Sequence, residues 1–207
     1  MAPRNASSTK AKQSGLPRVP GWVWLLSGLL LALTVSLGIA LGPTLLAIAP
    51  VVTHPGGPSR FESRYIPSEA MAPTLIAGDR LTVDKQAYQK QPVQRQDIIL
   101  FWPPEKAALP GQEPMEHLFR VIGLPGETMQ ITQGKVLIQG APISEPYLQE
   151  APSYEWGPQQ VPQDHYFVLG DNRNNSYDSH YWGFVPQASI TGKAVKIFWP
   201  SARITDL

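Results

Sequence analysis

The sequence contains no cysteine among its 207 residues. This absence excludes disulfide bonds, thiolate metal sites and a cysteine nucleophile. It does not identify the compartment, because many proteins outside the cytoplasm fold without disulfides. Helical periodicity of useful length is also missing after residue 49, and no internal repeat is present. The 22 prolines, 17 glycines and 43% hydrophobic residues favour a loop-rich β protein with a real core.

Acidic residues are absent from the first 20 positions, which carry four basic residues, Arg4, Lys10, Lys12 and Arg18. Subtracting these four from the total of 17 Lys and Arg leaves 13, against 16 Asp and Glu, in the rest of the chain. A nucleic-acid-binding protein would carry its basic excess on the folded domain. The balance therefore argues against nucleic acid as a partner and predicts that residues 1–20 are a disordered tail.

Charged residues are absent from residues 21–49 as well, and this stretch is strongly apolar. Trp22 to Leu41 would extend about 30 Å as a helix, enough to cross a bilayer. The basic residues before it predict a cytoplasmic N-terminus and an exported C-terminal domain. A cleaved secretory signal, with Ala47-Ile48-Ala49 as its site, is the alternative. Such signals have apolar regions of about 7–15 residues, so we interpret residues 21–49 as an uncleaved, single-pass membrane anchor.

Residues 50–60 are rich in Pro and Gly and are interpreted as a linker to a domain over residues 61–207. In that domain, short β-rich runs alternate with turn residues. The predicted strands are 61–66, 80–85, 97–102, 117–123, 128–132, 135–139, 165–169 and 193–199. Hairpin turns are expected at residues 131–135 and at Gln139-Gly140. The pattern predicts an all-β fold.

No group of residues has the spacing of a metal site. The four histidines, at positions 54, 117, 165 and 180, do not follow ligand patterns. The stretch from Asp171 to Ser176 has the Asp and Asn content of a calcium loop. However, Arg173 is its third residue and Trp182 its twelfth, where such a loop needs carboxylates. We therefore expect no metal and no cofactor.

Five segments resemble, in order, motifs of the type I signal peptidases, membrane-bound serine proteases that remove signal peptides from exported proteins. They are residues 65–75, 78–85, 97–101, 119–127 and 170–183. Tyr65–Leu75 resembles the family's Pro-Ser-x-Ser-Met-x-Pro-Thr-Leu. The resemblance implies a β-sheet or barrel catalytic domain behind a single N-terminal transmembrane helix. It also implies signal peptides or exported preproteins as partners, in addition to the lipid bilayer.

The family works with a serine nucleophile and a neutral lysine that acts as its base. In the matching register, the serine position falls on Ala70 and the lysine position on Phe119, and neither side chain can perform these roles. Ser68 matches the oxyanion-hole serine, Ser176 the serine that positions the lysine, and Asp178 a supporting acid. The matched walls of the pockets for Ala-x-Ala side chains are Ile66, Pro67, Met71, Leu75 and Leu118.

Further departures surround this site. His180 stands where the family has an arginine that pairs with the acid, and Asn174 where it has an aspartate. A shifted pair of Ser68 and His117 could replace the dyad, because each lies two residues before a lost position. Residues i and i−2 share a strand face, which would place His117 beside Phe119. The shift would move the hydroxyl by several ångströms, more than catalysis tolerates, which favours an ordinary half-buried or surface histidine.

Three hypotheses follow for the function. The first is a membrane-anchored, signal-peptidase-like protein without peptidase activity that binds signal-peptide-like segments or assembles with a partner protein. The second is an active signal peptidase that cleaves after Ala-x-Ala with a shifted or different set of catalytic residues. The third is a structural module whose peptide groove is closed by Phe119. The substitutions at Ala70 and Phe119 favour the first and third.

The charge pattern predicts the topology of the chain. We expect protease added to vesicles of known orientation to leave residues 61–207 intact when it reaches only the cytoplasmic side. Protease on the opposite side should degrade the same domain. Digestion of residues 61–207 from the cytoplasmic side would contradict the predicted orientation.

Overall fold

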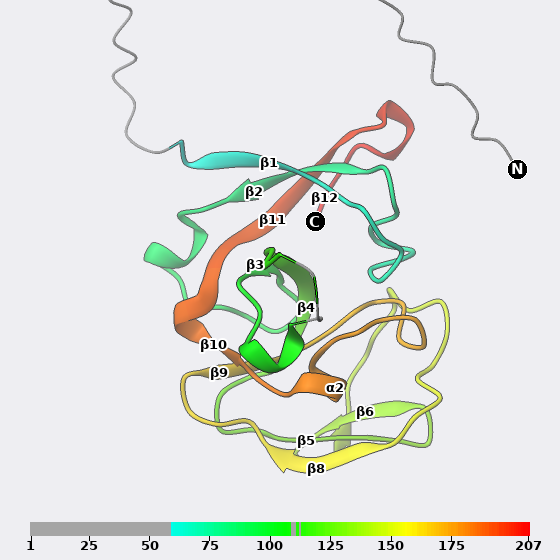
Figure 1. The fold of residues 1–207 in the computed structure, drawn as a ribbon. Helices are drawn as coiled ribbons and strands as arrows, with labels where there is room; N and C mark the ends of the chain where they lie inside the picture. Colours follow the sequence, from blue (N-terminus) through cyan, green and yellow to red (C-terminus); the bar gives the residue numbers. More distant parts are fainter. Residues whose placement is uncertain (1–58, 109–110, 112) are drawn as a thin grey trace, which may run out of the picture. The chain divides into compact units, whose positions relative to one another are not determined.

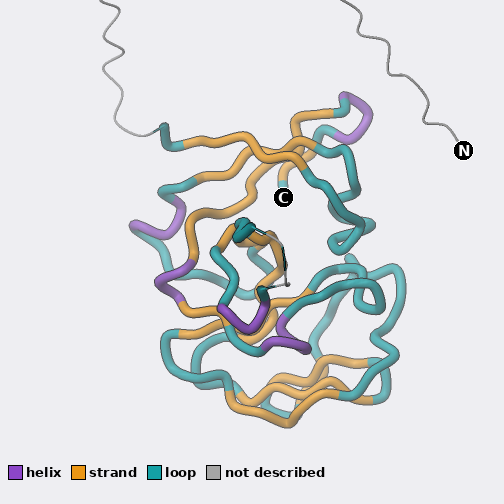
Figure 2. Tube along the Cα trace, in the orientation of Figure 1, coloured by secondary structure: helices purple, strands orange, loops and turns teal. Residues whose placement is uncertain are grey.

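The computed structural model describes residues 59–108, 111 and 113–207 (Figures 1 and 2). The predicted tail, the predicted anchor and residues 50–58 of the linker lie outside this part of the chain. Within the described ranges, no helix combines the length and apolar character needed to cross a bilayer. These residues form two β-sheets joined by loops and short helical turns.

The larger sheet has eight strands, in the order β1-β2-β11-β3-β4-β9-β10, with β12 paired to β11. All pairings are antiparallel. Its strands are β1 (Phe61–Tyr65), β2 (Arg80–Asp84), β3 (Ile98–Phe101), β4 (His117–Gly123), β9 (His165–Leu169), β10 (Val185–Pro186), β11 (Ile190–Trp199) and β12 (Thr205–Asp206). The long strand β11 lies between β2 and β3 and therefore joins the two halves of the sheet (Figure 1).

The smaller sheet has four strands, in the order β7-β6-β5-β8. They are β5 (Thr128–Thr132), β6 (Lys135–Ile138), β7 (Ala141–Pro142) and β8 (Trp156–Gln160). Both predicted hairpin turns are present. Gln133-Gly134 joins β5 to β6, and Gln139-Gly140 joins β6 to β7, with positive φ at all four residues. Glycine adopts this conformation without the steric cost of a side chain, which explains its place in both turns.

The predicted strands agree closely with the structure, and the all-β prediction is confirmed. The only α-helix in the described residues is α2 (Ser179–Trp182), four residues long. The 3₁₀ helices are η1 (Ala87–Gln89), η2 (Glu105–Ala107), η3 (Gln187–Ser189) and η4 (Ser201–Arg203). Strands β7, β8, β10 and β12 were not predicted. β8 contains Gly157-Pro158 and is mostly exposed, so it lacks the apolar alternation that identifies a strand in a sequence.

The interior consists of two clusters of buried apolar side chains, and Gly123 lies where they meet. One cluster packs on the larger sheet and includes Phe101, Phe119 and Val121. The other includes Met129 and Phe167 and packs mainly between β4, β9 and the smaller sheet. Further members of this second cluster are Ile122, Ile131, Val136, Ile138, Val161 and Leu169.

A methyl group on Gly123 would overlap the second cluster. An added Cβ would lie 2.9 Å from Val161 Cγ2, 3.0 Å from Phe167 Cβ and 3.1 Å from Met129 Sδ. We expect Gly123→Ala to lower the free energy of unfolding by about 1–3 kcal/mol, the usual cost of overpacking. Denaturant unfolding of the chain would measure it. In a Val161→Ala background, which makes room for the methyl, the same change should cost less. Equal costs in both backgrounds would contradict this account.

Candidate functional site

The segment that carries Ala70 is a compact turn between β1 and β2. Two backbone hydrogen bonds close it, from Ala72 N–H to Glu69 O at 3.0 Å and from Leu75 N–H to Met71 O at 2.9 Å. The side chains of Met71 and Leu75 are buried in the larger cluster, with 3% and 0% exposure. They anchor the turn, so the position of Ala70 is set by apolar burial on its C-terminal side.

The loop after β9 lies against this turn. Asn172 N–H donates to Ala70 O at 3.1 Å, and the Asn172 side-chain amide donates to Glu69 O at 3.1 Å. Gly170 makes the closest approach. A Cβ at this position would lie 2.4 Å from Ala70 O and 2.3 Å from Ser176 Oγ. Only glycine allows this contact, which places Gly170 against both the Ala70 carbonyl and the Ser176 hydroxyl.

Phe119 is buried beside this contact, on β4. Its exposure is 7%, and its ring centroid lies 6.3 Å from that of Phe101 and 6.0 Å from that of His117. The hydroxyl of Ser176 is buried and has no hydrogen-bond partner among the described residues. An unsatisfied buried hydroxyl is costly, typically about 1–3 kcal/mol. A phenyl ring offers no acceptor or strong donor that could satisfy it.

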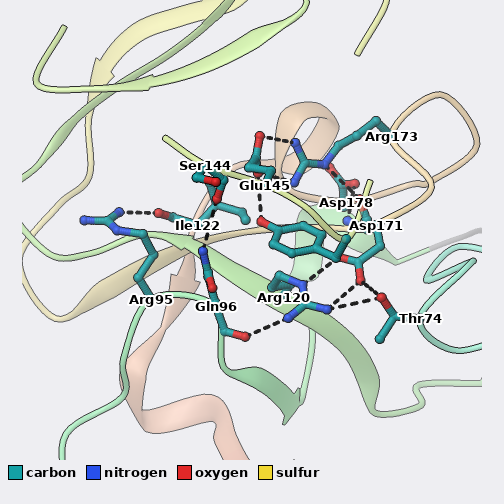
Figure 3. A network of polar contacts seen from close by, with 12 residues as sticks. Thr74, Arg95, Gln96, Arg120, Ile122, Ser144, Glu145, Asp171, Arg173 and Asp178 are labelled. Carbon is teal, nitrogen blue, oxygen red and sulfur yellow. Dashed lines mark hydrogen bonds and ion pairs between the residues drawn. The ribbon is translucent and has the colours of Figure 1, made fainter. Parts of the chain in front are cut away.

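A buried ion pair ties the turn to β4, and sequence reasoning did not identify it. Arg120 donates from Nε and Nη2 to the two carboxylate oxygens of Asp171 at 2.7 and 2.6 Å. Thr74 Oγ1 donates to Asp171 at 2.5 Å, and Arg120 Nη1 donates to Gln96 O at 2.9 Å. Figure 3 shows Arg120 between Asp171, Thr74 and Gln96. The face of the guanidinium lies 4.0 Å from the ring centroid of Tyr147.

The predicted supporting acid, Asp178, is completely buried at the start of α2. It accepts hydrogen bonds from Gly170 N–H at 2.9 Å and pairs with His180 Nδ1 at 2.6 Å. The His180 ring is stacked on Tyr154 at 4.0 Å. Asn174 accepts two hydrogen bonds from Ser153, at 2.8 and 2.9 Å. His180 and Asn174, which stand where the family has an arginine and an aspartate, therefore both make specific contacts. The polar groups around Gly170 form a connected hydrogen-bond network.

The five predicted wall residues lie at different depths. Three of them, Ile66, Met71 and Leu75, belong to the buried core, whereas Pro67 is exposed and Leu118 is half-buried. Leu75 has 0% exposure, so it packs beneath the turn and has no surface available to a peptide in this structure. Any direct contact with a peptide would therefore come mainly from Pro67 and Leu118.

The structure gives no support to a shifted pair of Ser68 and His117. Ser68 is exposed on the turn. The Nδ1 atom of His117 is buried without a hydrogen-bond partner in the described part of the chain. The rings of His117 and Phe119 contact each other edge to face at 6.0 Å, as expected for residues on one strand face. Burial lowers the pKa of His117, because charge is unfavourable in this environment.

Comparison with other proteins shows to which family this chain is related. Residues 39–199 match the family described as signal peptidase, peptidase S26. Signal peptidase I of Leptolyngbya laminosa is 56% identical over 149 residues, which are 70% of this chain and 72% of that protein. The chain belongs to the type I signal peptidase family.

Other relatives agree with this membership. Probable signal peptidase I-2 of Synechocystis is 46% identical over 144 residues, covering 69% of this chain and 65% of that protein. A crystal structure of a signal peptidase I from Enterococcus faecalis is 37% identical, with a TM-score of 0.42, over 50% of this chain and 97% of the solved one. The family match over residues 39–199 and the Leptolyngbya laminosa relative confirm the resemblance of the five motifs to signal peptidases.

The pairing of Arg120 with Asp171 was not predicted from the sequence. Arg120 directly follows Phe119 in a matched segment, and Asp171 follows Gly170 in another. The available signal was that each charged residue adjoins an apolar run, Arg120 before Val121-Ile122 and Asp171 after Val168-Leu169-Gly170. Charges rarely enter a core unless they are paired. Their pairing across the fold could not be read from either segment alone.

His117 should make the stability of the chain sensitive to acid. Its neutral form is favoured in the folded state, so the unfolded chain takes up a proton at the ordinary pKa of about 6.5 while the folded chain does not. Stability should therefore fall as the pH drops below about 6.5. His117→Phe, which keeps a ring but cannot titrate, should lose less stability between about pH 7.5 and pH 5.5. Equal losses in thermal unfolding would contradict the assignment.

Proposed function

We propose that this chain is a membrane-anchored, signal-peptidase-I-like protein that binds signal-peptide-like segments on the exported side without cleaving them. The observation that supports this proposal most is the identity of the residues at the two positions matched to the dyad. Ala70 supplies no nucleophile, and Phe119 is packed into the core where the family has a base. The buried hydroxyl of Ser176 has no hydrogen-bond partner among the described residues. This supports the view that the site has lost a polar group that paired with it.

Peptide binding is supported by two unpaired strand edges. Among the described residues, β1 ends the strand order and pairs only with β2. His117–Phe119 of β4 pair with β3 on one side. On the other side of β4, pairing with β9 begins only at Arg120. We call the junction of these two edges, where side chains from β1 and the start of β4 meet, the seam. An extended peptide could add there as a strand, with backbone hydrogen bonds supplying affinity.

The membrane location rests on the sequence. The uncharged run of residues 21–49 and the basic residues before it favour an anchor with a cytoplasmic N-terminus. In that orientation the β domain would meet segments that have just crossed the bilayer. The retained family motifs, from Tyr65 to Gly183, support a partner of the same chemical kind, an extended segment with small Ala-x-Ala side chains.

The absence of turnover is tested by restoring the two missing groups. A whole catalytic unit is worth roughly a millionfold in rate, so the unmodified chain should release no product from a signal-peptide substrate. Ala70→Ser alone should also be inactive, because the hydroxyl would face Phe119 without a base. Ala70→Ser with Phe119→Lys should cleave after Ala-x-Ala, since Ser68, Ser176 and Asp178 match the family's supporting residues.

A matched control variant distinguishes the effect of adding a base from the effect of removing the Phe119 ring. Ala70→Ser with Phe119→Met has a flexible apolar chain in place of the ring and should stay inactive. Adding Ser68→Ala to the active double variant should lower kcat by about 10²–10³-fold, the usual cost of one oxyanion donor. Cleavage by the unmodified chain, abolished by both Ser68→Ala and His117→Ala, would overturn the proposal and establish the shifted pair.

A further inference from the structure

The seam is held by a small cluster of charged side chains. Arg64 of β1 donates from Nη2 to Glu116 Oε2 at 2.6 Å, and Glu116 directly precedes β4. The hydroxyl of Thr191, on β11, donates to the other carboxylate oxygen of Glu116 at 2.6 Å. Arg64 is also paired with Glu62. A single ion pair, between Arg64 and Glu116, therefore joins the two unpaired edges.

This cluster lies on the core side of the sheet. In the pairing register, Arg64 stands opposite Leu81 and Glu62 opposite Val83, and both partners have 0% exposure. Directly opposed residues of antiparallel strands project from the same face. The side chain of Glu116 is only 13% exposed. Alternate side chains of a peptide strand in the seam would project toward this cluster, because successive residues of a strand point to opposite faces.

A peptide that enters between the edges must separate Arg64 from Glu116. The two groups then differ in the partners that remain to them. Arg64 keeps its ion pair with Glu62, whereas Glu116 keeps only the hydroxyl of Thr191. A largely buried carboxylate without a cationic partner is unfavourable. The opened seam therefore has one uncompensated negative charge, at a defined place beside the first residues of β4.

We propose that Glu116 selects peptides with a basic side chain at the position that faces it, so that the peptide replaces Arg64 as its partner. The inference deepens the proposed peptide binding and rests on it. A leucine at this position would bury apolar surface against three charged groups and would leave Glu116 unpaired. A glutamate would be repelled by Glu116 and Glu62. Arg64 acts as an internal substitute that is displaced when a suitable peptide binds.

The test uses the full chain in detergent micelles and fluorescent extended peptides that share one Ala-x-Ala core. A single lysine is moved through successive positions before the core, and leucine and glutamate are then placed at the best position. Fluorescence anisotropy gives each Kd. We expect one lysine position to bind about tenfold more tightly than leucine, as one charge-assisted pair allows. The glutamate peptide should bind more weakly than the leucine peptide.

Two variants test whether Glu116 is the residue that recognises the lysine of the peptide. Glu116→Gln should abolish the preference for lysine over leucine, while binding of the leucine peptide remains measurable. Glu127→Gln is the matched control, because Glu127 also pairs with an arginine, Arg95, at 2.5 Å. It should keep the preference.

The possible failures are distinguishable. Binding of the leucine peptide at least as tightly as every lysine peptide would overturn the selection by Glu116 and leave the proposed function standing. A lysine preference that survives Glu116→Gln would overturn the assignment to this residue. If no peptide of the series binds, the proposed peptide binding and the selection fail together.

Discussion

The buried pairing of Arg120 with Asp171 is the interaction on which the site depends. Arg120 belongs to the central strand β4, and Asp171 to the loop after β9. Thr74, from the turn that carries Ala70, donates to the same carboxylate. Removing one partner of a buried pair typically costs about 3–5 kcal/mol, because the other charge is left uncompensated. Here loss of Asp171 would also weaken the link between the turn and the loop, leaving it to the two hydrogen bonds from Asn172 to Ala70 and Glu69.

The positions matched to the family's dyad, Ala70 and Phe119, are occupied by apolar side chains that pack against or within the larger cluster. The surrounding polar groups do not rely on them. Asp178 is satisfied by Gly170 and by His180, and Asn174 by Ser153. Ser176, His117 and Tyr154 each have a buried polar atom without a partner, within the residues that the structure describes. The hydrogen bonds of Asp178 and Asn174 do not involve the side chains at positions 70 and 119.

Much of the fold could be predicted from the sequence because its signals are local. Short β-rich runs bounded by turn residues identified β4, β5 and β9, and glycine after glutamine identified the turns at Gly134 and Gly140. The strand β8 could not be identified, since its exposed, proline-containing sequence has no alternation. In the site, the resemblance assigned supporting roles to Ser176 and Asp178, and these roles stay predictions. The pairing of Arg120 with Asp171 is set by the three-dimensional approach of distant segments, which no local pattern records.

The separation of those segments along the chain has a consequence for folding. Thr74 and Asp171, which share a hydrogen bond, are 97 positions apart. Contacts between distant positions form only after a large loop has closed, and chains rich in such contacts fold slowly. During synthesis the N-terminal part of the domain emerges first, and the turn around Ala70 must wait for the loop after β9 before it is fixed. The hydrogen bonds between the turn around Ala70 and the loop after β9 can therefore form only late in synthesis, after most of the β domain has emerged.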